Sequence, residues 1–346
     1  MKTAIELAER GLLPDIALRA GIRQMVARRR RAMGEPTGSL LVSNQQMFAD
    51  RLAGGPIAVE TDAANAQHYE VPARFFEAVL GPRLKYSSCY YPSEQATLAE
   101  AEEAMLALTC ERAGLTDGMD LLELGCGWGS LTLWMAAHYP SSAITAVSNS
   151  ASQRLFIEHK AREMGLANVR IITADINEFV PPGTYDRIVS VEMFEHLRNW
   201  PLIFSRVASW MRPEARAFLH VFCHRTQPYL YGDNGQGDWM ARHFFTGGMM
   251  PSDDLPRYID SPLEVEEHWQ VDGSHYERTA NDWLANLDRQ RGLLMPVLAA
   301  TYGAADARRW LHRWRLFFIG CAELFGHRHG QEWRVAHHRL KLRADR

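Results

Sequence analysis

The stretch Glu123-Leu124-Gly125-Cys126-Gly127-Trp128-Gly129 decides the fold class of this chain. It ends an apolar run, Met119 to Leu124, that reads as a buried strand, and it leads into a helix-like stretch from Leu131 to Ala137. Glycines at such a point let the backbone turn tightly and let a ligand lie against it. The stretch therefore predicts a strand–turn–helix unit with a small-molecule site at the turn.

Short apolar runs alternate with amphipathic stretches on the C-terminal side of this turn. Such alternation predicts a parallel sheet covered by helices on both faces. The expected strands are residues 119–124, 143–147, 169–173, 187–191 and 217–222, and the expected helices are residues 131–137, 150–164 and 202–211.

The segments on either side of this core have a different character. Residues 1–110 read as mostly helical, with breaks at residues 34–36, 54–56 and 81–82. Residues 225–262 are rich in Gly, Pro, Asp and aromatic residues, which suits an irregular lid, and helices over 276–302 and 305–325 lie between strands at 263–270 and 333–342. We expect a helical cap (1–110), a ligand-binding core (111–225), and a part that holds the lid, the substrate-pocket helices and the final sheet strands (226–346).

The ligand of the glycine turn follows from its spacing and from a missing carboxylate. A nicotinamide site needs Asp or Glu about 20 residues further on, at the end of the second strand. Residues Val147 to Ser150 offer none. The G-x-G-x-G spacing, with Glu123 two positions before the first glycine, instead resembles the first motif of class I methyltransferases. A turn that only joins strand and helix is the alternative.

This resemblance implies a cofactor, S-adenosylmethionine, and assigns residues to it. The glycine loop lies against the amino-acid part of the cofactor in that family, which implies roles for Glu123, Gly125, Gly127 and Gly129. Asp175, followed by Ile176, falls just past the third expected strand, where such enzymes contact the adenine.

Three further stretches, Tyr69–Phe76, Lys85–Tyr91 and Ser148–Gln153, look like cyclopropane fatty acid synthases and their relatives. That family holds the ribose with a hydroxyl and a glutamine, which fits Ser148 and Gln153, with Asn149 in the same motif. Tyr86 and Ser87 match its segment that closes over the methionine end of the cofactor.

Within this family the match narrows to the coclaurine N-methyltransferase group. It is carried by Glu192-Met193-Phe194-Glu195-His196, by Phe245 to Ser252 and by Trp283. The resemblance implies a Rossmann-like sheet of seven strands whose last pair is antiparallel. A helical N-terminal cap and a helical C-terminal insertion would cover the active site. Cyclopropane synthases carry a cysteine after the Tyr-Ser pair, where this chain has Ser88.

Methylation of an amine requires a free lone pair on nitrogen, whereas an aliphatic amine with a pKa near 10 is mostly protonated at neutral pH. A site must therefore bind the ammonium, remove its proton and hold the nitrogen in place. Glu192, Glu195 and His196 leave the end of the fourth expected strand, and on a helix they would share one face. Our hypothesis is that Glu192 or His196 takes the proton while Glu195 orients the ammonium. A charged helix start is the alternative.

A cationic substrate and a sulfonium cofactor both favour aromatic walls. Helical spacing of aromatics suits a buried stripe equally well, and Arg313 stands beside Trp314 where the plant amine methyltransferases lead us to expect an aromatic residue. The candidate wall residues are Tyr90, Phe244, Phe245, Trp314, Phe317 and Phe318.

Composition limits the remaining function classes. The net charge of −3 gives no general attraction to nucleic acid or to acidic membranes, although Arg28 to Arg31 could meet a lipid surface on an amphipathic segment. The five cysteines have no zinc or redox spacing, and we expect no metal. Early acidic residues, Glu6 and Glu9, and the lack of a long uncharged run favour a cytoplasmic, soluble protein. A lipid-modifying enzyme, a non-catalytic cofactor-binding protein and a homodimer stay open.

Overall fold

In the computed structural model, residues 2–59, 71–232 and 239–344 are described, and within them seven strands form one sheet. Tyr69 and Glu70, which begin one of the family motifs, lie outside these ranges. The strand order is β3-β2-β1-β4-β5-β9-β8. The strands from β3 to β5 are parallel, and β9 runs antiparallel to both of its neighbours. The expected Rossmann-like class I methyltransferase sheet, with its last pair antiparallel, is confirmed.

The core strands and helices occur where the hydrophobic pattern predicts them. In chain order they are β1 (Asp120–Leu124), α7 (Ser130–His138), β2 (Ala143–Ser148), α8 (Ala151–Glu163), β3 (Val169–Thr173), β4 (Tyr185–Val191), α9 (Trp200–Trp210) and β5 (Met211–His224). The strand β5 begins earlier than expected because Met211 pairs with Tyr185 and Arg216 with Arg187 on β4, on either side of an irregularity in the register. Pairing with a neighbour, rather than local apolar pattern, extends this strand.

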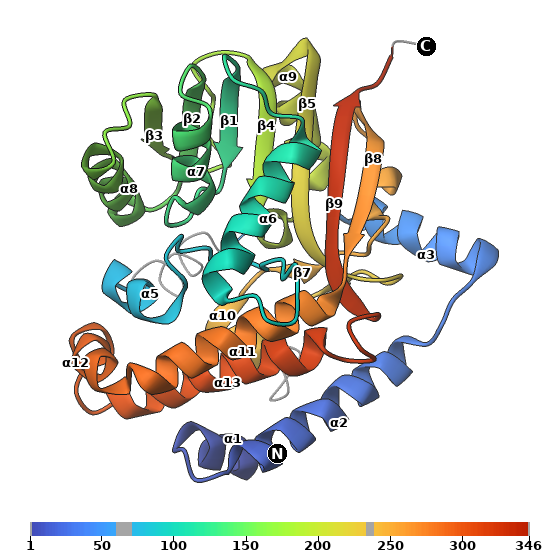
Figure 1. Cartoon of the computed structure of the whole chain (residues 1–346). Helices are drawn as coiled ribbons and strands as arrows, with labels where there is room; N and C mark the ends of the chain where they lie inside the picture. Colours follow the sequence, from blue (N-terminus) through green and yellow to red (C-terminus); the bar gives the residue numbers. More distant parts are fainter. Residues whose placement is uncertain (1, 60–70, 233–238, 345–346) are drawn as a thin grey trace.

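The N-terminal region is mostly helical, with breaks at the three expected glycine- and proline-containing sites and a further, unexpected one at residues 10–14. Its helices are α1 (Lys2–Glu9), α2 (Asp15–Met33), α3 (Gly38–Arg51), α5 (Ala73–Val79) and α6 (Leu98–Ala113). Figure 1 shows α2 running along α13, and ion pairs fasten the two: Arg315 binds Asp15, and Glu323 accepts from Arg19.

The C-terminal region holds short lid elements, three helices and the last two strands. These are β6 (Tyr229–Leu230), α10 (Trp239–Phe244), β7 (Met249–Met250), η2 (Leu255–Tyr258), β8 (Leu263–Val271), α11 (Gly273–Arg289), α12 (Arg291–Tyr302), α13 (Ala307–Phe325) and β9 (Trp333–Leu342). The two long helices, α11 and α13, lie side by side and cross the end of the sheet where β1 and β4 end (Figure 1). The division at residues 110 and 225 stays a prediction.

The single helix expected over residues 276–302 is wrong. It is two helices that meet at Gln290, which ends α11 and begins α12. The change of direction lets α12 fold back toward α13, where Leu294 and Leu298 become fully buried in the same apolar cluster as Leu311. The polar run at residues 288–292, which ends in Gly292, interrupts the apolar periodicity between Leu287 and Leu293. The expectation of a single helix overlooked this signal.

Gly129 ends the glycine turn as the N-cap residue of α7 and faces the neighbouring helix α8. Its φ is +82°, and a Cβ there would lie 2.7 Å from Cγ1 of Ile157 on α8. A side chain would therefore strain the backbone and also push the two helices apart. Gly118 has a similar φ of +87° but no atom within 4 Å of a Cβ.

We predict that Gly129→Ala destabilises the fold more than Gly118→Ala does. Both variants carry the left-handed backbone cost of about 1–2 kcal/mol, and Gly129→Ala adds an overpacking cost of about 1–3 kcal/mol. Urea unfolding followed by tryptophan fluorescence measures both. Equal losses of unfolding free energy would show that α8 yields freely at Ile157.

Candidate active site

One cavity opens at the carboxyl ends of β1, β2 and β4, and residues of α11 and α13 line it as well. Figure 1 shows these two helices crossing the ends of the strands. Its empty space, which includes the open solvent at its mouth, is about 1610 Å³. Ligands of open parallel sheets bind at this edge. The glycine turn and the Glu192 carboxyl group both line this one space.

One end of the cavity is built from the glycine turn and the ends of β2 and β3. Except for Gly129, whose Cβ position faces Ile157, every residue that we expected to bind cofactor lines it. At Gly127 a Cβ would meet no atom within 4 Å, so a ligand can lie against the backbone there. The lining residues are Tyr86, Ser87, Glu123, Gly125, Gly127, Ser148, Asn149, Gln153, Asp175 and Ile176.

Two polar groups at this end are held for a ligand. The Ser148 hydroxyl donates to Oε1 of Gln153 at 2.6 Å, and this buried pair joins β2 to α8. Burial raises the pKa of Glu123 to about 7, although Thr132 donates to its Oε2 at 2.5 Å. In these contacts of the described residues, no charged partner compensates the buried Glu123 carboxylate, so a cationic ligand group beside it would stabilise its ionised form.

At the other end, Glu192 presents its carboxyl group from an unusual backbone conformation. It has φ of +47°, which is rare for a residue with a Cβ, and its amide donates to the carbonyl oxygen of His220 at 2.8 Å. The α-helix that we considered for residues 192–196 does not form: a single 3-10 turn covers Phe194 to His196. Glu192 therefore points into the cavity independently of that turn.

Three donors from distant parts of the chain surround the Glu192 carboxyl group. The Ser88 amide donates to Oε1 at 2.8 Å, and the Tyr276 hydroxyl donates to Oε2 at 2.7 Å. Nε2 of His220 lies 3.2 Å from Oε1. Burial raises the pKa of Glu192, while the nearby Lys85 ammonium and the donors Ser88 and Tyr276 lower it. The contacts favour the ionised form, which a buried carboxyl group otherwise resists.

His196 lies at the cavity, whereas Glu195 does not. His196 lines the cavity and stacks on Phe245, with ring centroids 5.2 Å apart and planes 5° apart. Glu195 is fully buried and does not line the cavity; its Oε1 accepts from the Phe222 amide at 2.6 Å. Burial and the neighbouring Glu192 raise its pKa well above the usual range. Glu195 is thus placed beside Glu192 and away from a substrate.

The expected aromatic wall is only partly brought to the cavity. Phe245 and Phe317 line it. Phe244, Trp314 and Phe318 do not, because they pack on one another as fully buried core. Tyr90 stacks on His275 instead, at 4.5 Å. Arg313 binds Glu9 and also lies outside the lining.

Other lining residues were missed by sequence reasoning. They include the buried Lys85, whose Nζ donates to Ser87 Oγ at 2.5 Å and to the Ser88 carbonyl oxygen at 2.7 Å. Tyr276, Trp283 and Phe222 also line the cavity. His220, which contacts Glu192 from behind the cavity, was also missed, although it is a polar residue in the middle of an apolar strand. Tyr276 and Trp283 belong to stretches that resemble the coclaurine N-methyltransferase group, and that resemblance was the signal for them.

The chain matches the family model of mycolic acid cyclopropane synthetase over residues 59–335. The chain belongs to this family. Within the family, its sequence is 37% identical over 333 residues to an (S)-coclaurine N-methyltransferase of Thalictrum flavum subsp. glaucum, covering 95% of this chain and 92% of that protein. The cyclopropane-fatty-acyl-phospholipid synthase of Escherichia coli K12 is 29% identical over 272 residues, covering 78% of this chain and 66% of that one.

Solved structures agree with the sequence relatives. The crystal structure of a coclaurine N-methyltransferase bound to N-methylheliamine and S-adenosylhomocysteine has a TM-score of 0.94 and 35% identity. It covers 98% of this chain, and this chain covers 99% of it. Both the fold and the narrower branch expected from the sequence are confirmed.

Among the described residues, one group has donor atoms close enough to hold a metal ion: Asp253, His268 and His338. Nε2 of His268 lies 2.8 Å from Oδ1 of Asp253, and Gln270 also bonds the carboxylate. The two imidazole rings stack with planes 7° apart, so their in-plane lone pairs run side by side instead of converging. An Arg334 nitrogen 3.9 Å from Asp253 already supplies positive charge. The group reads as a hydrogen-bonded cluster between β8, β9 and the lid.

Tyr276→Phe should lower stability more at pH 8 than at pH 5. Burial raises the pKa of Glu192, so its ionised form costs folding energy at high pH, and losing the Tyr276 donor raises that pKa further. The loss of unfolding free energy should be about 1.5–3 kcal/mol where Glu192 is ionised. It should shrink as the pH falls through the pKa of the folded state and Glu192 becomes protonated.

Tyr91→Phe is the matched control, because its hydroxyl also donates to a carboxylate at 2.7 Å, on Asp282, outside the cavity. Urea unfolding of both variants at the two pH values measures the effect. A loss at Tyr276 that is the same at pH 5 and pH 8 would contradict the ionised state of Glu192.

Proposed function

We propose that this chain is an S-adenosylmethionine-dependent N-methyltransferase that acts on a small amine, a tetrahydroisoquinoline or a related arylalkylamine. The observation that carries the proposal is the buried, donor-held Glu192 carboxylate at one end of a cavity whose other end is a methyltransferase glycine turn. The similarity to coclaurine N-methyltransferases over nearly the whole chain supports the same activity.

When bound, S-adenosylmethionine supplies a methyl group on a sulfonium. The residues present fit it: Glu123 can face its ammonium, the glycine turn leaves backbone open, and the Ser148–Gln153 pair offers a hydroxyl and an amide to the ribose. Asp175 and Ile176 stand where the adenine would lie. These assignments follow the family resemblance residue by residue.

The chain's task is to deliver an uncharged nitrogen to the methyl group. The substrate enters as an ammonium and is attracted by ionised Glu192, whose side chain is almost fully buried. Its proton passes to Glu192 or to His196, the nitrogen lone pair forms the new N–C bond, and the S–C bond breaks. The N-methylated product is again cationic, and one proton is released overall. Phe245, Phe317 and the Tyr276 ring can contact the aromatic part and the cation.

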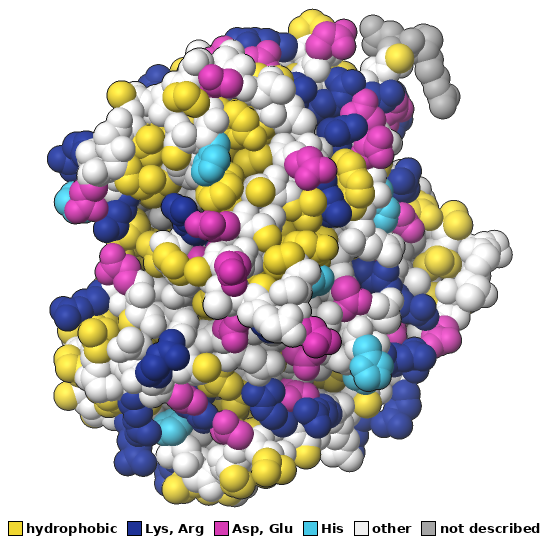
Figure 2. Space-filling view, in the orientation of Figure 1, with side chains coloured by type: hydrophobic (Ala, Val, Ile, Leu, Met, Phe, Trp, Pro, Cys, Tyr) yellow, Lys and Arg dark blue, Asp and Glu magenta, His cyan; other side chains and the backbone are white. Residues whose placement is uncertain are grey.

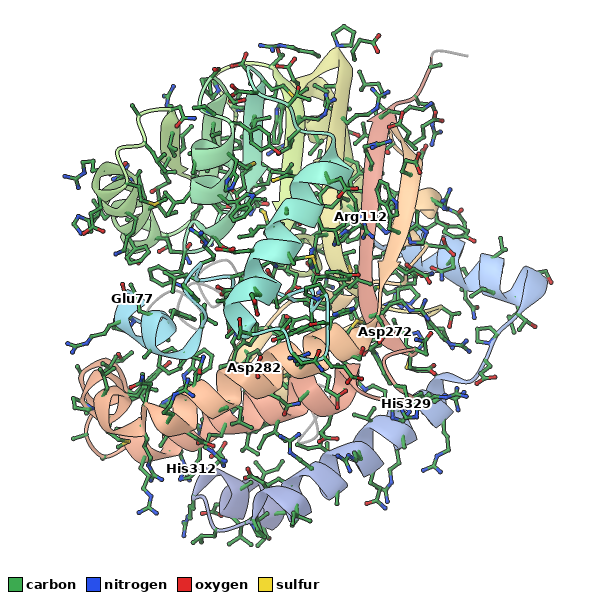
Figure 3. All side chains as sticks on the ribbon, in the orientation of Figure 1. Glu77, Arg112, Asp272, Asp282, His312 and His329 are labelled. Atoms are coloured by element: carbon green, nitrogen blue, oxygen red, sulfur yellow. The ribbon has the colours of Figure 1, made fainter. Side chains whose placement is uncertain are left out.

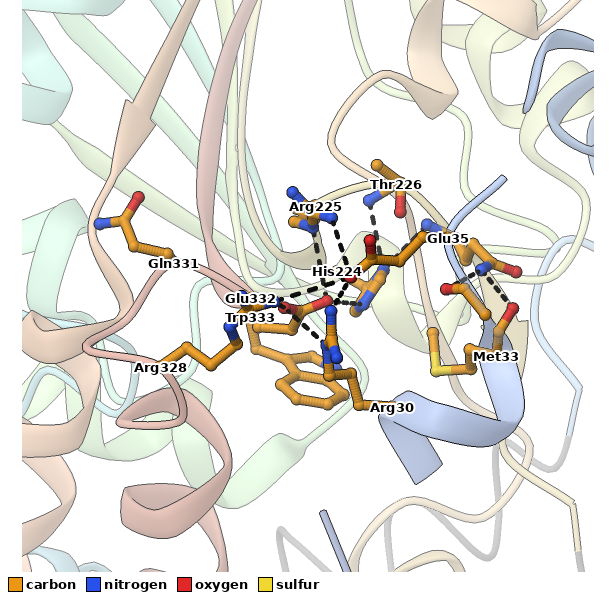
Figure 4. Close-up of polar contacts among 12 residues, drawn as sticks. Arg30, Met33, Glu35, His224, Arg225, Thr226, Arg328, Gln331, Glu332 and Trp333 are labelled. Atoms are coloured by element: carbon orange, nitrogen blue, oxygen red, sulfur yellow. Dashed lines mark hydrogen bonds and ion pairs between the residues drawn. The ribbon is translucent and has the colours of Figure 1, made fainter. Parts of the chain in front are cut away.

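A lipid-modifying enzyme is the second candidate, because the family is named for cyclopropane synthesis. Two arginines of the run that could meet a membrane already contact other residues of the chain. Arg30 pairs with Glu332 at 3.3 Å and with Glu35, and Arg29 lies 4.8 Å above the Tyr229 ring. Figure 4 shows Arg30 within this cluster, and Figure 2 shows charges of both signs interspersed over one face. Within the described ranges, no helix has the length and apolar character to cross a bilayer.

A substrate panel separates the two candidates. Purified protein is incubated with S-adenosylmethionine and with primary, secondary and tertiary tetrahydroisoquinolines, simpler arylalkylamines, and anionic vesicles with unsaturated chains. Mass spectrometry should show methyl gain on an amine together with S-adenosylhomocysteine. Mass gain on the lipid chains alone would overturn the proposal, and cofactor binding without any turnover would favour a non-catalytic protein.

Alanine at Glu192 and alanine at His196 should each lower kcat/KM for the amine at least 100-fold, because proton transfer by a positioned side chain contributes about that much. Cofactor affinity, measured by calorimetry, should stay within a few-fold, since neither residue belongs to the cofactor end of the cavity.

Glu332→Ala is the matched control for Glu192. Glu332 is also buried and also lies 3.2 Å from a buried histidine, His224, but it lies outside the cavity, among Arg225, Arg30 and Arg328 (Figure 4). Its loss should lower stability without a comparable loss of turnover. Near-normal rates in both the Glu192 and His196 variants would show that neither residue handles the proton.

A further inference from the structure

Behind Glu192, a line of hydrogen-bonded side chains crosses the interior and ends at a partly exposed arginine. Nε2 of His220 faces Glu192 Oε1 at 3.2 Å, and Nδ1 of His220 lies 3.0 Å from Nε2 of His337. Nδ1 of His337 lies 2.8 Å from an Nη of Arg112, near the end of α6. Both histidines are fully buried on β5 and β9, where they are direct cross-strand partners. Figure 3 shows Arg112 between α6 and β9.

The arginine fixes which nitrogen of each ring carries a proton. A guanidinium can only donate, so Nδ1 of His337 must accept. A neutral His337 then carries its proton on Nε2 and donates it to Nδ1 of His220. A neutral His220 in turn carries its proton on Nε2 and donates to Glu192. All three bonds therefore point toward the carboxylate.

Burial and the charged groups around this line of side chains keep both imidazole rings neutral. Burial lowers the pKa of His220 and of His337 well below the usual range, and the charges of Lys85 and Arg112 lower both further. His220 also lowers the pKa of His337, as does His338 on the opposite side of β9. Glu192 faces Lys85, Tyr276 and the neighbouring Glu195 as well.

We propose that Arg112 and His337 are positioning residues, which act through His220 to hold Glu192 ionised and facing the substrate. The inference rests on the proposed function, because it takes Glu192 as the group that receives the ammonium. Neither residue lines the cavity. Arg112 cannot accept a proton, so the line orients Glu192 and does not carry the substrate proton out to solvent.

Arg112→Met removes the fixed donor and should shift the acid limb of the kcat/KM–pH profile upward by about one pH unit. Without that donor the two imidazole rings can take the other tautomer, which withdraws a hydrogen bond from ionised Glu192. They can also take up a proton, which makes Glu192 a weaker acceptor of the substrate's proton. Both effects require a higher pH for full activity. His337→Leu should do the same, whereas His337→Gln, which can accept from Arg112 and donate to His220, should stay near the wild-type profile.

Arg339→Met is the matched control. Arg339 lies over the same Trp269 ring as Arg112, binds Glu266 and donates to the backbone carbonyl oxygen of Arg112 at 3.3 Å. Its side chain therefore neighbours the line but takes no part in the hydrogen bonds that join Arg112 to the two histidines. Its pH profile should overlay that of the wild type. Cofactor affinity should be unchanged in all of these variants.

Nitrogen-15 NMR of histidine-labelled protein reads the tautomers without any turnover. Two buried rings should carry their proton on Nε2 in the wild type and lose that state in Arg112→Met. If the tautomers change as expected but no amine is methylated, the proposed function fails and the tautomer assignment stands. If amines are methylated while the tautomers and the pH profile of Arg112→Met match the wild type, the positioning role is overturned.

Discussion

The Glu192 carboxylate is almost removed from water, and a buried charge is stable only when hydrogen-bond donors surround it. This constraint ties together parts of the chain that are far apart in sequence. The Ser88 amide comes from the segment before α6, His220 from the middle of β5, and the Tyr276 hydroxyl from α11. The sheet, the N-terminal segment and the C-terminal insertion must therefore dock in one arrangement for the charge to be held.

The backbone at Glu192 shows the cost of that arrangement. A left-handed φ at a residue with a side chain persists only where the surroundings over-determine it. Here the amide of Glu192 bonds to β5 through the His220 carbonyl oxygen, while its side chain accepts three donors. Leaving the regular path of β4 at this residue sends the carboxylate into the cavity, which a helix start would not do.

The sequence predicted well what local pattern determines. Strand β9 occurs at the expected residues, and the glycine turn stands at the end of β1, because alternating burial and turn chemistry are written over a few neighbouring residues. It predicted poorly what depends on distant partners. The turn at Gln290 is a different case, because the polar run of residues 288–292 marks it and was overlooked. Trp314 and Phe317 share one helix, although only Phe317 reaches the cavity. Helical spacing alone cannot separate a core aromatic from a pocket aromatic.

The geometry around Glu192 also shows which difference from the cyclopropane synthases bears on the choice of substrate. Ser88 stands where cyclopropane synthases are expected to carry cysteine, yet its backbone amide, which almost any residue offers, is what contacts Glu192. The side chain at Glu192 matters more, because it brings a negative charge to the acceptor end. A carboxylate has about four lone-pair positions, and among the described residues three donors occupy three of them. The position that is left, on Oε2, suits one N–H of an ammonium. An uncharged alkene has no donor to place there, so the arrangement at Glu192 favours an amine as the methyl acceptor.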